Sequence, residues 1–185
     1  MKNRELASLF QKMADILEFK GDNPFKINTY RKSARILNDL TMDIQEVVQS
    51  GTLQNIPCIG KGTADKIVEY LETGTIAKFD ELRMGIGDEL IALLGIQSLG
   101  PKTVSLLHKE LEINSLEELQ KAIADERITE LPGMGKKKIE NIARGIELYA
   151  LRKERMSLGE ALVIARDAIE QIIKAAHITA IEIAG

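Results

Sequence analysis

The sequence has 185 residues, with 25 basic and 28 acidic side chains, a formal net charge of −3 and one cysteine. This length suffices for one large domain or two small domains with hydrophobic cores. The balanced charge excludes a polycation that coats nucleic acid, and the single cysteine excludes an internal disulfide. Because no apolar run of membrane-spanning length and no apolar signal core occurs, we expect a cytoplasmic protein without a membrane partner.

Strand-forming segments are scarce, and apolar residues recur at helical spacing, so the predicted fold class is mostly all-α. The pattern predicts a helix over residues 4–19, which the stretch 21–24 ends, and a third, short helix over residues 41–49. Between them lies a second helix with Ile27 and Leu37 on its apolar face. Its other face is expected to carry four basic residues, either as a solvated surface or as a phosphate-binding surface with Tyr30 beside it: Lys26, Arg31, Lys32 and Arg35.

Three stretches share one pattern, in which an apolar residue, a corner of small residues and an amphipathic helix follow one another. They are residues 56–62, 96–102 and 131–137, and their aligned glycines are Gly60, Gly100 and Gly135. We expect these glycines to supply the positive φ of the corner or to let another backbone come close. The helix that follows offers unpaired N–H groups to a phosphate. The repeat predicts three helix-hairpin-helix units that bind the backbone of a nucleic acid.

The chain is predicted to divide at the glycine-rich stretch 84–88. We expect a first helical domain over residues 1–82 and a second over residues 83–152, which contains the second and third corners. Residues 153–185 then form a long helix and a strand, and because a strand needs a partner, they are expected to begin a larger fold.

Few side chains suggest catalysis. His108 and His177 are far apart and lack ligand spacing, and we expect His108 on a helix surface and His177 at a helix end. Cys58 occupies the corner position that Gly133 holds in the third stretch, so it is interpreted as a small corner residue. Lys66 lies six residues past Gly60, beside the first corner. A lysine amine near apolar groups and other cations can form a Schiff base with an aldehyde, but a surface lysine fits the same pattern.

Four stretches together resemble the N-terminal part of a bacterial or archaeal family X DNA polymerase, the family of DNA polymerase beta. They are residues 21–32, the corner 56–62 with Lys66, residues 99–103 and residues 131–135. The resemblance extends over essentially the whole chain. It implies a lyase-type domain, a helical DNA-binding domain and the helix-strand start of a nucleotidyltransferase palm.

The resemblance also implies roles for single residues. Lys66 would form the Schiff base with an abasic sugar phosphate, Lys26 would hold the 5′-phosphate of a gap, and Tyr30 would line that pocket. Lys78 would be another phosphate-contacting lysine. Further DNA contacts are expected at twelve positions: Lys32, Cys58, Gly60, Lys61, Gly62, Ser98, Gly100, Lys102, Gly133, Gly135, Lys136 and Lys137. Backbone carbonyls are expected to hold Na⁺ or K⁺ at the first two corners, namely those of Gln54, Ile56, Ile59, Leu94, Ile96 and Leu99.

Two positions depart from the animal members of the family. Phe25 replaces a histidine, and Gly62 replaces a second lysine, although Lys61 stands beside it. The lyase chemistry needs no cofactor, and Mg²⁺ is expected only for the palm aspartates, which would follow Gly185. The chain is therefore not expected to polymerise by itself, and the remainder of a polymerase chain is expected beyond it.

The function predicted from the sequence is sequence-independent binding of gapped or 5′-phosphorylated DNA, as part of a DNA repair polymerase. Whether Lys66 adds a 5′-deoxyribose phosphate lyase activity stays open. The alternatives are a DNA-binding module without catalysis and a protein-interaction scaffold.

Overall fold

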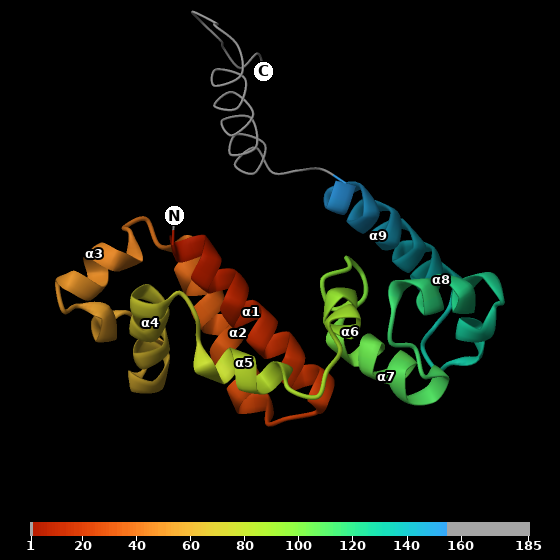
Figure 1. The fold of residues 1–185 in the computed structure, drawn as a ribbon, viewed down its shortest axis with the longest axis horizontal. Coiled ribbons are helices and arrows are strands. Elements are labelled where there is room, and N and C mark those ends of the chain that lie inside the picture. Colours follow the sequence, from red (N-terminus) through yellow and green to blue (C-terminus); the bar gives the residue numbers. More distant parts are fainter. Residues whose placement is uncertain (1, 155–185) are drawn as a thin grey trace, which may run out of the picture. The chain divides into compact units, whose positions relative to one another are not determined.

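The computed structural model describes residues 2–154, and every regular element in that range is a helix (Figure 1). This confirms the mostly helical class. The predicted strand and most of the predicted palm start lie outside the described residues. No helix within residues 2–154 is long and apolar enough to cross a membrane.

Two long helices, α1 (Lys2–Lys20) and α2 (Pro24–Asp39), lie side by side and form the base of the first core (Figure 1). The start of α2 follows from its local sequence. Asn23 Oδ1 accepts a hydrogen bond from Phe25 N at 2.8 Å, and Pro24 occupies the first turn, where its missing N–H costs nothing.

The third helix, α3 (Ile44–Gln49), begins three residues later than the sequence predicts. Asp43 caps it, with Oδ1 accepting a hydrogen bond from Gln45 N at 2.9 Å. The buried side chain of Asn3 fixes the residues before it, because its Oδ1 accepts from Ile44 N at 2.8 Å and its Nδ2 donates to the Met42 carbonyl at 2.8 Å. A side chain of α1 therefore sets where α3 begins.

The first corner joins a 3-10 turn, η1 (Leu53–Asn55), to α4 (Lys61–Thr73), and α5 (Ala77–Arg83) follows. Gly74 ends α4 in the left-handed conformation, with φ of 78° and its N–H bonded to the Tyr70 carbonyl. The buried side chains of the first core come from residues 6–82, and the partly buried Ile86 and Leu94 also pack against it. Its largest fully buried side chains are Phe10, Leu6, Met13, Ile16, Leu37, Ile44, Ile67 and Ile76.

Five further elements carry the second and third corners: α6 (Asp88–Leu93), α7 (Pro101–Leu111), α8 (Leu116–Ala124), η2 (Arg127–Glu130) and α9 (Lys136–Glu154). Their buried side chains, among them Leu93, Leu99 and Leu107, are not part of the first core. Within the described part of the chain, the residues up to Gly145 nevertheless form one compact unit. The domain division after residue 82 stays a prediction.

The side chain of His108 lies between α7 and α1 and not on an open helix surface, so that prediction is wrong. Its ring lies against Phe19 of α1, with centroids 5.7 Å apart and planes inclined by 47°. Its Nδ1 atom is buried and has no hydrogen-bond partner among the described residues. A buried polar atom without a partner destabilises the fold by about 1–3 kcal/mol.

We expect His108→Phe to raise the free energy of unfolding by about 1 kcal/mol, because phenylalanine keeps the ring contact and removes the unpaired nitrogen. Urea unfolding followed by circular dichroism measures the change. Lys109→Gln, at the exposed neighbouring position, is the control and should change the stability by less than about 0.5 kcal/mol. A clear loss of stability in His108→Phe would show that Nδ1 has a partner in solution.

Candidate nucleic-acid interface

The three predicted corners are one and the same β-turn. In each, the N–H of the fourth residue donates to the carbonyl of the first: Ile59 to Ile56 at 3.1 Å, Leu99 to Ile96 at 3.1 Å, and Met134 to Leu131 at 3.2 Å. The first and third turns carry Pro57 and Pro132 at the second position, where proline is favoured. The recurrence predicted from the sequence is therefore a recurrence of backbone structure.

The residue with positive φ is not the one that the sequence predicts. It is the third residue of each turn, with φ of 67° at Cys58, 70° at Ser98 and 75° at Gly133. By contrast, Gly60 and Gly100 have φ of −79° and −72°, which any residue can adopt. The placement of Cys58 as the counterpart of Gly133 is thus correct, whereas the prediction of positive φ at Gly60, Gly100 and Gly135 is wrong.

The aligned glycines Gly60, Gly100 and Gly135 instead leave open space at the start of the helix that follows each corner. A Cβ atom added to Gly60, Gly100 or Gly135 would meet no other atom of the protein within 4 Å. Their carbonyls accept the N–H groups of the third and fourth residues of α4, α7 and α9, so only the N–H groups of the first two positions remain available. In α7 the first position is Pro101, so only the N–H of Lys102 remains there. Packing within the chain does not require glycine at these positions. Close approach of another molecule's backbone would require it.

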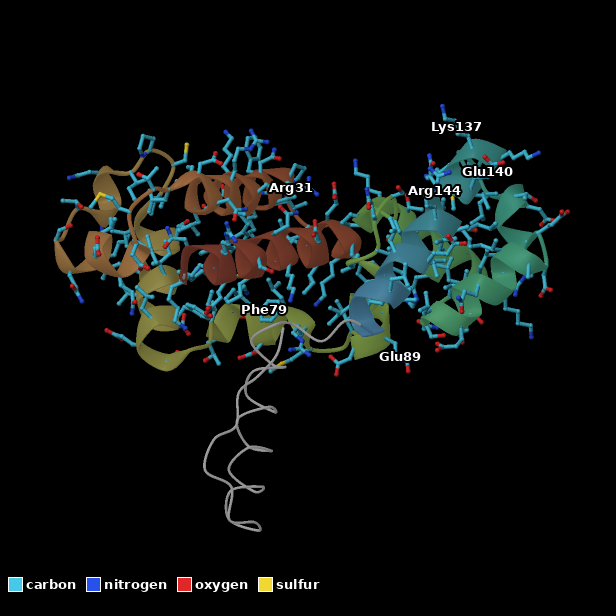
Figure 2. The ribbon with its side chains drawn as sticks, turned by 90° about the horizontal axis from the view of Figure 1, so that it is seen from above. Arg31, Phe79, Glu89, Lys137, Glu140 and Arg144 are labelled. Carbon is cyan, nitrogen blue, oxygen red and sulfur yellow. The ribbon has the colours of Figure 1, made fainter. Side chains whose placement is uncertain are left out.

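The second and third corners meet in an open depression of about 530 Å³. Six residues line it: Ser98 from the second corner, and Gly135, Lys136, Lys137, Lys138 and Asn141 from the third. Figure 2 shows Lys137 at the start of α9, with its side chain pointing into solvent. The depression thus combines the positive end of a long helix with three cationic side chains, which suits a phosphate.

Gly145, inside α9, makes this arrangement possible, and the sequence analysis missed it. A Cβ atom at this position would lie 2.1 Å from the carbonyl oxygen of Gln97 and 3.3 Å from Ile96 Cγ2. Only glycine therefore lets α9 lie directly against the second corner. A glycine within a predicted helix is the sequence signal that could have revealed this contact.

The structure gathers Lys26, Tyr30 and Lys78, three of the residues expected at a 5′-phosphate, around Asp22. Lys26 Nζ is 3.3 Å from Asp22 Oδ1, and Lys78 Nζ is 2.6 Å from Glu81 Oε1. The half-buried ring of Tyr30 stacks on Phe10, with centroids 5.7 Å apart.

Electrostatic interactions among these groups shift their pKa values. The N–H of Asn23 and the Lys26 ammonium lower the pKa of the Asp22 carboxyl, and Lys78 adds to the effect. Burial raises the pKa of the Tyr30 phenol, against the smaller opposing effect of Lys78. The hydrogen bond to Glu81 raises the pKa of Lys78. Tyr30 is therefore neutral and Lys78 is charged at neutral pH, as anion binding requires.

The four basic residues of α2 do not share one face, in contrast to the sequence prediction. Arg31, which Figure 2 labels, turns toward α1, where its guanidinium pairs with Glu18 and lies 3.6 Å from Asp15. Because residues advance by 100° along a helix, Lys26 also projects away from the exposed Lys32 and Arg35. Only Lys32 and Arg35 form a solvated basic stripe.

Lys66 lies on α4 at the first corner, as predicted, and its Nζ donates to the Gly62 carbonyl at 2.9 Å. None of the ion pairs among the described residues involves Lys66, so no carboxylate there holds its ammonium group. Within the same range, no hydrogen bond or ion pair joins it to Lys26, Tyr30 or Lys78. Lys61, Gly62 and Lys102 are exposed near the starts of α4 and α7, and Phe25 is 81% exposed.

The repeated turn and the exposed helix starts define a tandem helix-hairpin-helix protein. Residues 1–76 match the family described as a helix-hairpin-helix domain, and residues 90–147 match the SAM-like helix-hairpin-helix tandem. Over all 185 residues the chain is 32% identical to the DNA polymerase/3′-5′ exonuclease PolX of Bacillus subtilis strain 168, and it covers 32% of that protein's length. The chain therefore belongs with the family X DNA polymerases and corresponds to the N-terminal part of one. Both kinds of match support DNA binding.

Proposed function

We propose that the chain binds the sugar-phosphate backbone of DNA without reading the bases and prefers a gap that carries a 5′-phosphate. The observation that supports this function best is the threefold repetition of one turn, each leading into the start of a helix with at least one free backbone N–H group. Amides and lysines recognise phosphates, and phosphate contacts carry no sequence information. The second family match and the relationship to PolX agree with this proposal.

The preference for a 5′-phosphate rests on the group around Asp22. A terminal phosphate carries more negative charge than a phosphodiester, and Lys26 and Lys78 are two cations that can approach the same anion. The Tyr30 hydroxyl, held neutral by burial, can donate a hydrogen bond to it. A phosphate bound here competes with Asp22 and Glu81 for the two lysines.

One titration tests both parts of the proposal. Fluorescence anisotropy compares labelled gapped DNA with and without the 5′-phosphate, each in two unrelated base sequences. We expect the 5′-phosphate to tighten binding about tenfold and the base sequence to change it by less than about twofold. In Lys26→Ala the preference for the phosphate should shrink, whereas Lys12→Ala, on the exposed part of α1, should retain it. Equal affinity for both ends contradicts the gap preference, and no affinity for DNA favours a protein-interaction scaffold.

A lyase activity is the second candidate function, and the position of Lys66 supports it. The amine lies beside a corner that can hold a phosphate, and none of the ion pairs among the described residues involves it. In the proposed reaction, the unprotonated amine adds to the C1′ aldehyde of an abasic sugar and water leaves, which gives a Schiff base. No cofactor takes part.

We also propose that the corner carbonyls hold Na⁺ or K⁺. The carbonyls of Ile56 and Ile96 each accept one turn hydrogen bond. Since a carbonyl oxygen has two lone pairs, each retains an acceptor site for a cation. The other carbonyls expected to take part are those of Gln54, Ile59, Leu94 and Leu99. A bound cation would supply positive charge between the turn and a phosphate.

A further inference from the structure

We propose that the second and third corners bind one DNA phosphate jointly, in the depression between Ser98 and the start of α9. This inference rests on the proposed DNA binding and assigns it a composite site. In that site the second corner supplies a hydroxyl, and the third corner supplies the cations and the N–H groups of a helix start. The ligand is a phosphodiester of duplex DNA.

Close backbone contact joins α9, the helix that follows the third corner, to the second corner. Gly145 brings α9 so close to the second corner that a single added carbon would overlap the Gln97 carbonyl. Gln97 directly precedes Ser98, whose positive φ of 70° fixes the end of the same turn. The position of Ser98 relative to the start of α9 is therefore determined by backbone packing and not by flexible side chains.

The residues that line the depression are chemically suited to an anion. No ion pair among the described residues involves Lys136, Lys137 or Lys138, so their charges are not neutralised locally. The Ser98 hydroxyl and the Asn141 amide are exposed and can both donate hydrogen bonds. A site with several donors and no acidic residue in its lining selects an anion.

The first corner provides the internal comparison. Lys61 follows Gly60 as Lys136 follows Gly135, so both lysines occupy the first position of a helix. Lys61 does not line the depression with Ser98. The proposal therefore predicts that Ser98 acts together with Lys136 and independently of Lys61.

A double-mutant cycle tests this difference on labelled duplex DNA without a gap or a 5′-phosphate. We expect Ser98→Ala and Lys136→Ala each to weaken binding about three- to tenfold. The double variant should bind at least about threefold more tightly than the product of the single effects predicts, because both changes disrupt the same phosphate contact. The effects of Ser98→Ala and Lys61→Ala should multiply.

Gly145 is a positioning residue in this proposal, so Gly145→Ala should weaken binding and remove the coupling between Ser98 and Lys136. A general loss of stability would not remove the coupling selectively, and circular dichroism reports whether the variant is folded. If Gly145→Ala does not fold, the cycle in the native background still decides the question. Independent effects of Ser98 and Lys136, or equal coupling of Ser98 to Lys61, overturn the composite site while DNA binding remains. A native chain that does not bind duplex DNA overturns the proposed function itself.

Discussion

Lys66→Ala is expected to abolish the covalent adduct that borohydride traps between the chain and an incised abasic site. The alanine variant has no amine to form the Schiff base, so no reducible intermediate arises at this position. Binding of gapped DNA should weaken by no more than about tenfold, since one contact among several is lost. A denaturing gel with labelled DNA detects the adduct, and anisotropy measures the binding.

Lys61→Ala is the matched control, because Lys61 is an exposed lysine on the same helix. It should lower affinity but retain trapping. An adduct that persists in Lys66→Ala would assign the chemistry to another amine. If the native chain binds gapped DNA and never traps, Lys66 is a binding residue, and the chain binds DNA without catalysis.

Valine at Gly133 and valine at Gly135 are expected to produce opposite effects, although the two positions are only two residues apart. Gly133 has φ of 75°, which a β-branched residue adopts only with strain, so Gly133→Val should lower the free energy of unfolding by about 1–3 kcal/mol. At Gly135 the φ is ordinary and the space is open, so the same change should alter stability by less than about 1 kcal/mol.

DNA affinity should show the reverse order in the folded proteins: Gly135→Val should weaken binding more than Gly133→Val. The valine side chain at position 135 would fill the space through which a DNA backbone approaches the start of α9, and we expect binding to weaken at least about tenfold. Urea unfolding and anisotropy on the same two variants give both quantities. Unchanged affinity in Gly135→Val would show that DNA does not approach the third corner closely.

Local sequence signals were sufficient to predict the parts of the fold that depend on neighbouring residues. The start of α2 follows from Asn23 and Pro24, and the end of α4 from Gly74. The corners were found because their pattern repeats, and Cys58 was placed correctly by alignment with Gly133. The glycine with positive φ was misassigned because two of the three turns have no glycine at that position.

Contacts between distant residues could not be predicted from local patterns. Arg31 resembles its basic neighbours in the sequence, but the carboxylates of Glu18 and Asp15 on α1 attract it toward the protein. His108 likewise lies in an amphipathic helix, and only the packing of α7 on α1 buries its Nδ1. The depression between the second and third corners depends on the close approach of Gly145 to Gln97, two residues that are far apart in the sequence.

The ion pairs of Lys26 and Lys78 have a consequence for the ionic-strength dependence of binding. When a lysine without a carboxylate partner binds a phosphate, no carboxylate is left unpaired, and the contact releases cations condensed on the DNA. In the proposed complex, Lys26 and Lys78 would instead exchange Asp22 and Glu81 for phosphate oxygens, and the released carboxylates would then attract cations from solution. The proposed contacts at the 5′-phosphate would therefore release fewer ions overall than contacts at the corners. At the proposed gap, added salt should weaken the contacts at the corners more than recognition of the 5′-phosphate.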